Sequence, residues 1–216
     1  MRFLFLALMA FSSAVSAQPR GGWNEWSMHL LAIVGSNDEF DGGASARNDG
    51  GVGVGLSVAR SLNHYFALGA EATFAQTRYR ATMTPGAGNT AAAFESNGTL
   101  ETAALRVHAT WNLLSTPVTP FLTAGAGVIF LDPDLPDDLP ASGCWFYPWY
   151  GQVCGDKGPQ GNLARFTYTA GAGVRYDLPG QQGFLRAYVG GEWINFAEAA
   201  SPVATVQFRA DFGLRF

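Results

Sequence analysis

Apolar side chains recur at every second position through most of this chain. Between residues 51 and 59, Val52, Val54, Leu56 and Val58 alternate with glycine, serine and alanine. Successive side chains of a β-strand point to opposite faces, so this order produces one apolar face and one bare face. A helix would not place every second residue on one face. The pattern therefore predicts a strand in this segment.

Seven other segments repeat the alternation, namely 23–34, 65–74, 105–113, 122–130, 166–176, 185–193 and 204–216. The last is the clearest, whereas the first has apolar residues at both parities. Strands of about ten residues match the tilted crossing of a bilayer, and soluble strands average about five or six residues. The chain is therefore predicted to form an all-β fold, an eight-stranded antiparallel transmembrane up-and-down β-barrel.

A soluble β-sandwich would also alternate, so further observations are needed to choose between the two. Charged residues make up 14% of the chain, against about 25% in an average globular protein. Aromatic residues gather near the predicted strand ends, where the interfacial girdles of membrane barrels lie. They are Trp26, Phe66, Phe74, Trp111, Phe130, Tyr176, Trp193 and Phe216. Both observations favour the barrel.

The predicted connections alternate between short and long. Short turns are expected near residues 61–63, 115–119 and 179–182, and long loops at 36–49, 83–97 and 132–161, with a shorter one near 197–202. Bacterial outer-membrane barrels have short turns on the periplasmic side and longer loops outside. An even number of strands then places both chain ends on the periplasmic side.

The first 17 residues have the features of a secretory signal. Arg2 precedes a short apolar stretch, and Val15-Ser16-Ala17 supplies the small residues of a cleavage site. The barrel domain is then expected to span residues 18–216. The apolar stretch is too short to cross a bilayer, which disfavours the alternative of a retained anchor. No later run of 18 apolar residues occurs, and the acidic net charge gives no basis for a nucleic-acid partner.

Charged residues fall on the predicted inner faces of the strands. They are Glu71, Arg106, Arg175, Arg186, Glu192, Arg209, Asp211 and Arg215. Charges at membrane depth must pair with each other or with water, and eight strands enclose little more space than side chains can fill. We therefore expect a packed network of ion pairs. A narrow polar conduit is the alternative, because glycines on the same faces leave room for water.

The third long loop contains both cysteines, Cys144 and Cys154. A secreted chain passes through an oxidising compartment, so the two cysteines are expected to form a disulfide. A zinc site is disfavoured because none of the three histidines lies nearby. No metal is expected at Asp132, Asp134, Asp137 and Asp138 either, since they lack the spacing and glycine of an EF-hand loop, and Ca²⁺ binding there is a minor alternative.

The segment between the cysteines is unusually aromatic. It contains Trp145, Phe146, Tyr147, Trp149 and Tyr150. Aromatic side chains at this density suggest a contact surface for a partner, a plug over the barrel mouth or anchors in the headgroup layer. A loop that packs on itself is the plainer alternative.

Signals for an enzyme are weak. The sequence contains neither a Gly-x-Ser-x-Gly elbow nor a His-Glu-x-x-His motif. His29 and His108 are expected to face the lumen, and His64 lies near a periplasmic turn. Gly51-x-Gly53-x-Gly55 lacks the helix that a dinucleotide-binding loop requires. We expect no catalytic residue and no cofactor.

The leader and two further motifs resemble a known family. Ala-Gly-Ala-Gly-Val occurs at 124–128 and again at 170–174, where Arg175-Tyr176-Asp177 follows, and the chain closes with Phe212-Gly-Leu-Arg-Phe216. In these features the chain resembles small outer-membrane proteins of the OmpA/OmpX/OmpW type, in the outer membrane protein beta-barrel domain family. The resemblance implies that Phe216 is part of a signal read by the barrel-assembly machinery. A periplasmic domain that binds the cell wall is not expected after Phe216.

These observations predict a protein of the bacterial outer membrane, in contact with membrane lipid and lipopolysaccharide. The first functional hypothesis is a structural or surface-interaction role carried by the extracellular loops, with a partner that the sequence does not identify. A narrow channel for small or hydrophobic solutes is the alternative. An enzyme that modifies outer-membrane lipid is the third hypothesis.

Overall fold

The computed structural model describes residues 20–86, 91–134, 143–154, 163–180, 182–197, 199 and 202–216. The expected signal at 1–17 lies outside these ranges, as do Asp137 and Asp138. The described ranges contain an 11-stranded sheet and one short 3-10 helix.

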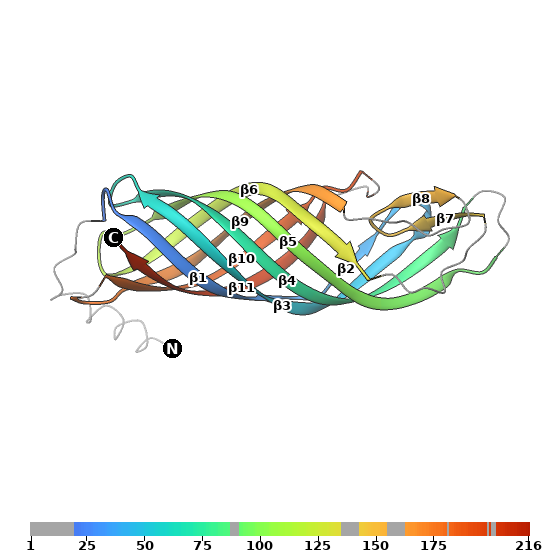
Figure 1. Ribbon diagram of the computed structural model, residues 1–216, viewed down its shortest axis with the longest axis horizontal. Coiled ribbons are helices and arrows are strands. Elements are labelled where there is room, and N and C mark those ends of the chain that lie inside the picture. Colours follow the sequence, from blue (N-terminus) through green and yellow to red (C-terminus); the bar gives the residue numbers. More distant parts are fainter. Residues whose placement is uncertain are drawn as a thin grey trace, which may run out of the picture.

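Eight long strands form a closed antiparallel barrel (Figure 1). They are β1 (Asn24–Ile33), β3 (Ser45–Ser61), β4 (Phe66–Pro85), β5 (Phe94–Asn112), β6 (Val118–Pro133), β9 (Leu163–Asp177), β10 (Gly183–Ile194) and β11 (Val203–Arg215). Each pairs with the next along the chain, and β11 pairs with β1 to close the ring. The predicted eight-stranded up-and-down barrel is confirmed.

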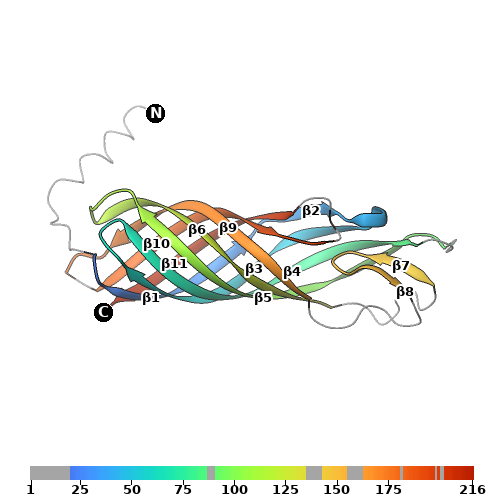
Figure 2. The ribbon, with the colours of Figure 1, turned by 90° about the horizontal axis from the view of Figure 1, so that it is seen from above.

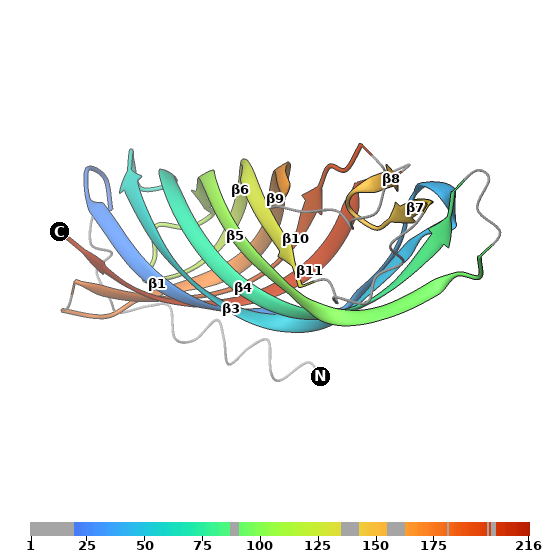
Figure 3. The same ribbon diagram turned by 45° about the vertical axis from the view of Figure 1, so that its right-hand side comes forward.

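Three further strands lie at one end of the barrel. β2 (Ser36–Glu39) pairs with β3, and β7 (Cys144–Tyr147) forms a hairpin with β8 (Gly151–Cys154). The last residues of β4 pair with β7. The 3-10 helix η1 (Asp41–Gly43) connects β2 to β3. We call residues 36–48, 77–86, 91–100 and 143–154 the extension, because they project beyond the ring (Figures 2 and 3).

The prediction of loops at 36–49 and 83–97 is wrong, since much of each segment is strand. β3, β4 and β5 contain 17, 20 and 19 residues, not about ten. Tyr79, Ala81 and Met83 continue the buried alternation of β4, but polar residues such as Arg78 and Arg80 face outwards there. The alternation of lipid-facing residues therefore ends before the strands do. At about 3.4 Å per residue, a strand of this length rises well beyond a hydrocarbon layer.

The apolar side chains of the barrel wall point outwards. Val52, Leu30 and Val107 are 70%, 67% and 66% exposed. A soluble barrel would bury such residues, whereas a lipid bilayer covers them without cost. The predicted orientation of the alternating faces is confirmed for the strands in the ring. Within the described ranges, no helix has the length and apolarity needed to cross a membrane.

Candidate functional site

All eight charged residues that the sequence assigned to the lumen lie inside the barrel, and each forms an ion pair. The alternation places them there, because their strands turn apolar neighbours to the outside. We call these residues, together with Arg20, Glu25 and Asp177, the ion-pair network.

The middle of the network centres on Glu71. This carboxylate accepts hydrogen bonds from Arg106 at 3.3 Å and from Arg209 at 2.5 Å. Arg106 also pairs with Glu192, and Arg209 pairs with Asp211 at 2.6 Å. Guanidinium and carboxylate groups therefore alternate from one wall of the lumen to the other. Such charge-assisted bonds hold side chains more firmly than neutral hydrogen bonds do.

Polar groups complete the bonding around Glu192. Its carboxylate accepts hydrogen bonds from Thr167 at 2.8 Å and from Gln207 at 2.9 Å, in addition to the pair with Arg106. Buried charges are stable only when their remaining hydrogen-bonding capacity is used. Glu192 meets this condition with partners from three other strands.

A second part of the network closes the end of the barrel that carries the short turns. Arg175 donates to both oxygens of Glu25, at 2.8 and 2.9 Å, and to Asp177 at 2.8 Å. Arg20 donates to Asp177 at 2.7 Å and to two backbone carbonyls of the 113–118 turn, at 3.0 and 2.6 Å. Arg20 is only 2% exposed, so it lies across this end of the lumen.

Arg20, Glu25 and Asp177 were missed as site residues. Glu25 and Asp177 fall on the inward parity of their own strands, β1 and β9, and this signal was available in the sequence. Arg20 precedes the first strand, so no alternation could place it. Only the folded structure brings it beneath a turn that lies about 95 positions further along the chain, as its bonds to the carbonyls of Leu114 and Thr116 show.

Phe184 connects the two parts of the network. Its ring is fully buried, and the guanidinium carbons of Arg175 and Arg186 lie over it at 4.1 and 5.0 Å. Glycines leave the space that such bulky inner side chains occupy. A Cβ at Gly213 would collide with Phe184, and one at Gly171 would collide with Tyr188. The bare inner faces noted in the sequence are therefore filled by side chains from neighbouring strands.

Both histidines that were expected in the lumen lie there. His29 shares a hydrogen bond of 3.3 Å with Thr73, and His108 is 3.9 Å from the Glu71 carboxylate. The side chains around His108 and Tyr188 enclose a cavity of about 30 Å³. A cavity of this size holds one or two water molecules. It is far smaller than a path for a solute.

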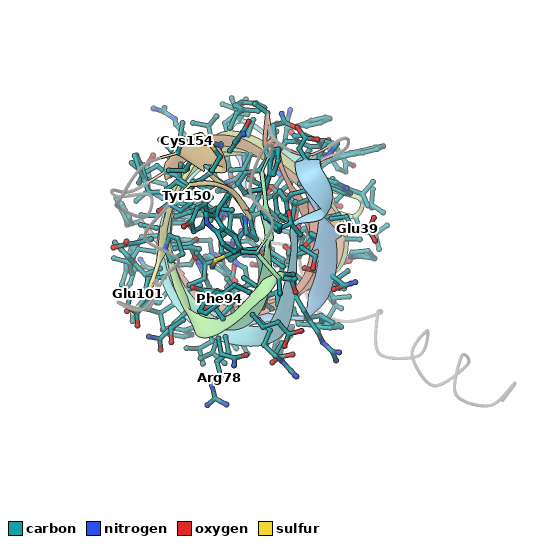
Figure 4. The ribbon with its side chains drawn as sticks, turned by 90° about the vertical axis from the view of Figure 1, so that its right-hand side faces the viewer. Glu39, Arg78, Phe94, Glu101, Tyr150 and Cys154 are labelled. Atoms are coloured by element: carbon teal, nitrogen blue, oxygen red, sulfur yellow. A yellow bond between two sulfur atoms is a disulfide. The ribbon has the colours of Figure 1, made fainter. Side chains whose placement is uncertain are left out.

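Apolar side chains fill the other end of the barrel. We call this set the mouth cluster, and its buried members are Phe40, Ala44, Ala46, Tyr79, Ala81, Met83, Leu100, Ala104, Ile129, Leu131, Trp145, Tyr147, Trp149, Ile194, Phe196 and Val203. They come from the strand ends opposite the short turns, from the loops after β2 and after β10, and from the β7–β8 hairpin. In Figure 4, which looks into this end, Tyr150 and Cys154 lie over the ring.

The expected contact surface is therefore wrong for most of its aromatic residues. Trp145, Tyr147 and Trp149 are 4%, 2% and 6% exposed, because they point into the mouth cluster. Phe146 and Tyr150 are half-buried against it. Burying an aromatic side chain in an apolar core is more favourable than leaving it in water. Of the alternatives considered, a plug over the barrel mouth agrees best with this packing.

Trp149 shows how strongly the plug is packed. Its backbone has a φ of 66°, a conformation that costs a bulky residue about 1–2 kcal/mol. Its ring packs edge-on against Tyr79 at 4.9 Å and against Phe40 at 6.3 Å. Tyr79 donates a hydrogen bond of 2.7 Å to the carbonyl of Asp134, and burial raises the pKa of this phenol to about 12. The packing of the indole therefore outweighs the backbone cost.

The predicted disulfide between Cys144 and Cys154 is present. The two cysteines face each other as partners in the β7–β8 ladder, so the bond holds the hairpin that carries the plug. Asp132 and Asp134 are the members of the acidic segment that the structure describes. Across the described ranges, no group of three or more histidine, cysteine, aspartate or glutamate side chains is placed to hold a metal ion.

Phe216 lies at the end of the ring that carries the short turns. Its backbone exchanges hydrogen bonds of 2.9 and 3.1 Å with Asn24, and its side chain is 63% exposed. It therefore stays on the lipid-facing side of the closing β1–β11 pair. This position leaves the expected role in assembly as a prediction.

Comparisons with known proteins agree with this architecture. No curated protein matches the sequence. Among solved structures, Neisserial surface protein A (NspA) is similar with a TM-score of 0.55 and 16% identity, over 91% of this chain and 98% of that one. OprG from Pseudomonas aeruginosa is similar with a TM-score of 0.54 and 12% identity, over 91% and 97%. At these identities the likeness shows the fold alone.

A family model describes nearly the whole chain. The model named "Outer membrane protein beta-barrel domain" matches residues 3–216. The match agrees with the closed ring and its exposed apolar wall, and it identifies the compartment. The chain belongs to the outer membrane protein beta-barrel domain family and is a protein of the bacterial outer membrane.

Proposed function

We propose that this protein is a closed barrel that anchors and presents an extracellular β-structure, and that its role is structural or one of surface interaction. In barrels of this kind the short turns face the periplasm, so the extension projects from the cell surface. The observation that carries the proposal is the double closure of the lumen, by the ion-pair network and by the mouth cluster. A protein that conducts solutes has no evident need for either.

The extension supports a role at the surface. β3, β4 and β5 continue as a sheet beyond the ring, and the disulfide-bonded hairpin packs on the end of β4. Rigid strands and a buried apolar core hold this structure in one shape. A preorganised surface loses less conformational entropy when it binds a partner than a disordered loop does.

Conductance measurements separate this proposal from a channel. The full mature chain is refolded, inserted into planar bilayers at neutral pH and compared with a porin in the same bilayers. We expect no single-channel steps from this protein, because its inner cavity holds one or two water molecules. Liposomes that contain it should likewise show no swelling in isotonic arabinose. Reproducible current steps, or swelling at the porin rate, would refute the closed barrel and favour the channel.

A further inference from the structure

A group of arginines lies on the outer face of the extension. Arg47 on β3 and Arg80 on β4 are directly opposite each other, and their side chains are 64% and 59% exposed. Arg78 lies two residues below Arg80 on the same face and points away from the barrel (Figure 4). Like charges that face each other across two strands repel, so this arrangement is unfavourable without an anion.

One carboxylate is placed among the three arginines by a β-bulge. Between Asn48 and Gly51 the register shifts, and Asp49 with Gly50 opposes Arg78 alone. Gly50 has a φ of 92°, and a Cβ there would also collide with the backbone of Ile33, so only glycine fits. The bulge turns Asp49 outwards, towards the arginines.

The charge of this patch is not balanced. Asp49 pairs with Arg47 at 3.3 Å and with Arg80 at 3.2 Å. Within the part of the chain that the structure describes, Arg78 has no ion pair. On the neighbouring strand, Glu101 accepts a hydrogen bond from Gln76 at 3.2 Å. Two guanidinium groups thus share one carboxylate and a third lies beside them, which leaves donors that suit phosphate oxygens.

The backbone of the patch lies just above the headgroup layer of the outer leaflet, within reach of long side chains. Phe74 is 60% exposed and is the last apolar outward residue of β4 before Gln76. A strand tilted by about 40° rises about 2.5 Å per residue, so Arg78 lies about 10 Å above Phe74 and Arg80 about 15 Å above it. The headgroup region extends about 5–7 Å beyond the hydrocarbon layer. Long arginine side chains also reach back towards it.

A largely apolar depression extends below the arginines over β3, β4 and their neighbouring strands, and Glu101 and Asp132 are among its lining residues. Its volume is about 1180 Å³, and its walls include Val52, Val54, Phe74 and Ala103. These residues face lipid, so acyl chains fill the depression in the membrane. A ligand that combines acyl chains with phosphate groups would contact the depression and the arginines at once.

We propose that Arg47, Arg78 and Arg80 bind the phosphate groups of lipid A, the membrane anchor of lipopolysaccharide, while its acyl chains lie in the depression below. In this arrangement one lipid A molecule is held in a fixed position beside β3 and β4. The site is separate from the proposed closed lumen and does not depend on it. A conducting barrel could carry the same site, and a closed barrel could lack it.

The test measures lipid binding to the full folded chain in detergent by native mass spectrometry. Lipid A with two phosphates is compared with the same lipid A after both phosphates are removed. We expect the variant R47Q/R78Q/R80Q to bind phosphorylated lipid A about tenfold more weakly than the native chain, a loss of about 1.4 kcal/mol. The dephosphorylated lipid should bind both proteins with the same low affinity.

Arg60 supplies the matched control, because it is an exposed outward arginine of β3 at the opposite end of the barrel. R60Q should bind phosphorylated lipid A like the native chain. If the triple variant fails to fold, as judged by heat-modifiable migration, R78Q alone should weaken binding about threefold. Equal binding by native and variant chains, or equal loss in R60Q, would overturn the site. Competition by inorganic phosphate at the concentration of lipid A would assign the patch to free anions and overturn the lipid assignment.

Discussion

Replacement of Arg175 by methionine tests whether buried ion pairs hold the turn end of the barrel closed. Arg175 is 2% exposed and donates three hydrogen bonds of 2.8 to 2.9 Å to Glu25 and Asp177. Methionine is unbranched and of similar length, so it removes the charge with little loss of packing. The effect should therefore come mainly from the acids that lose their partner.

The structure shows which of the two carboxylates, Glu25 or Asp177, depends on Arg175. Without Arg175, Asp177 keeps its bond to Arg20 at 2.7 Å, whereas the one hydrogen bond left to Glu25 among the described residues comes from the Ser61 hydroxyl at 3.4 Å. One buried carboxylate therefore loses its ion pair, not two, although the more distant charge of Arg186 still favours its ionised form. Breaking a buried pair in this way costs about 3–5 kcal/mol, so R175M should lower the free energy of unfolding by that amount. Replacing both partners with apolar residues is often close to neutral, so R175M/E25L should be less destabilised than R175M.

Urea unfolding of the refolded protein in detergent micelles provides the measurement, followed by tryptophan fluorescence and heat-modifiable migration. A double-mutant cycle with R175M, E25L and the double variant gives the coupling, which we expect to exceed about 2 kcal/mol. R80M is the control, because Arg80 pairs with Asp49 at the surface, where such pairs contribute about 0–1 kcal/mol. Additive single effects, or a loss below about 1 kcal/mol in R175M, would show that the network does not stabilise the barrel.

Two further predictions concern the mouth and the C-terminus. Trp149→Ala removes the indole that packs on Tyr79 and Phe40, a change that costs about 3–5 kcal/mol in a packed core, so chymotrypsin should cut the β7–β8 hairpin several-fold faster. Trp111→Ala, which affects a stacked lipid-facing pair with Phe66, should leave the rate unchanged, and equal rates in both variants would argue against a packed plug. Phe216→Ala should lower the amount of heat-modifiable protein in the outer membrane several-fold, because the resemblance of the C-terminus implies an assembly signal. Unchanged amounts in quantitative blots of outer-membrane fractions would contradict this role.

The barrel was predictable because lipid imposes a simple rule on its strands. Outward positions such as Val52 and Leu30 must be apolar, and inward positions are free to be small or polar. The parity of a residue therefore reports its side of the wall. The same rule failed above the hydrocarbon layer, where the outward residues Arg78 and Arg80 no longer contact acyl chains. There the strand continues without an apolar outer face, and the sequence carries the signal only in its buried residues.

The sequence predicted which residues belong to the ion-pair network, but not which residue pairs with which. Parity placed Glu71 and Arg209 in the lumen, yet they are 138 residues apart and meet only because the ring closes. Pairing depends on strand register and stagger, which alternation does not encode. The aromatic hairpin poses the opposite problem. Its composition was obvious, but whether Trp145 points outwards or inwards depends on the loops that surround it.

The two closures of the lumen differ in the way they can open. To open the ion-pair network, several buried charges must separate at once, and each broken pair costs several kcal/mol. The mouth cluster depends instead on loops and on a hairpin joined to the ring by the short β4–β7 ladder, so it can rearrange by local unfolding. The hairpin can therefore open locally, while β3, β4 and β5 keep the shape of the extension and the network below keeps the membrane sealed. A sealed barrel whose outer sheet keeps one shape is suited to recognition at the cell surface.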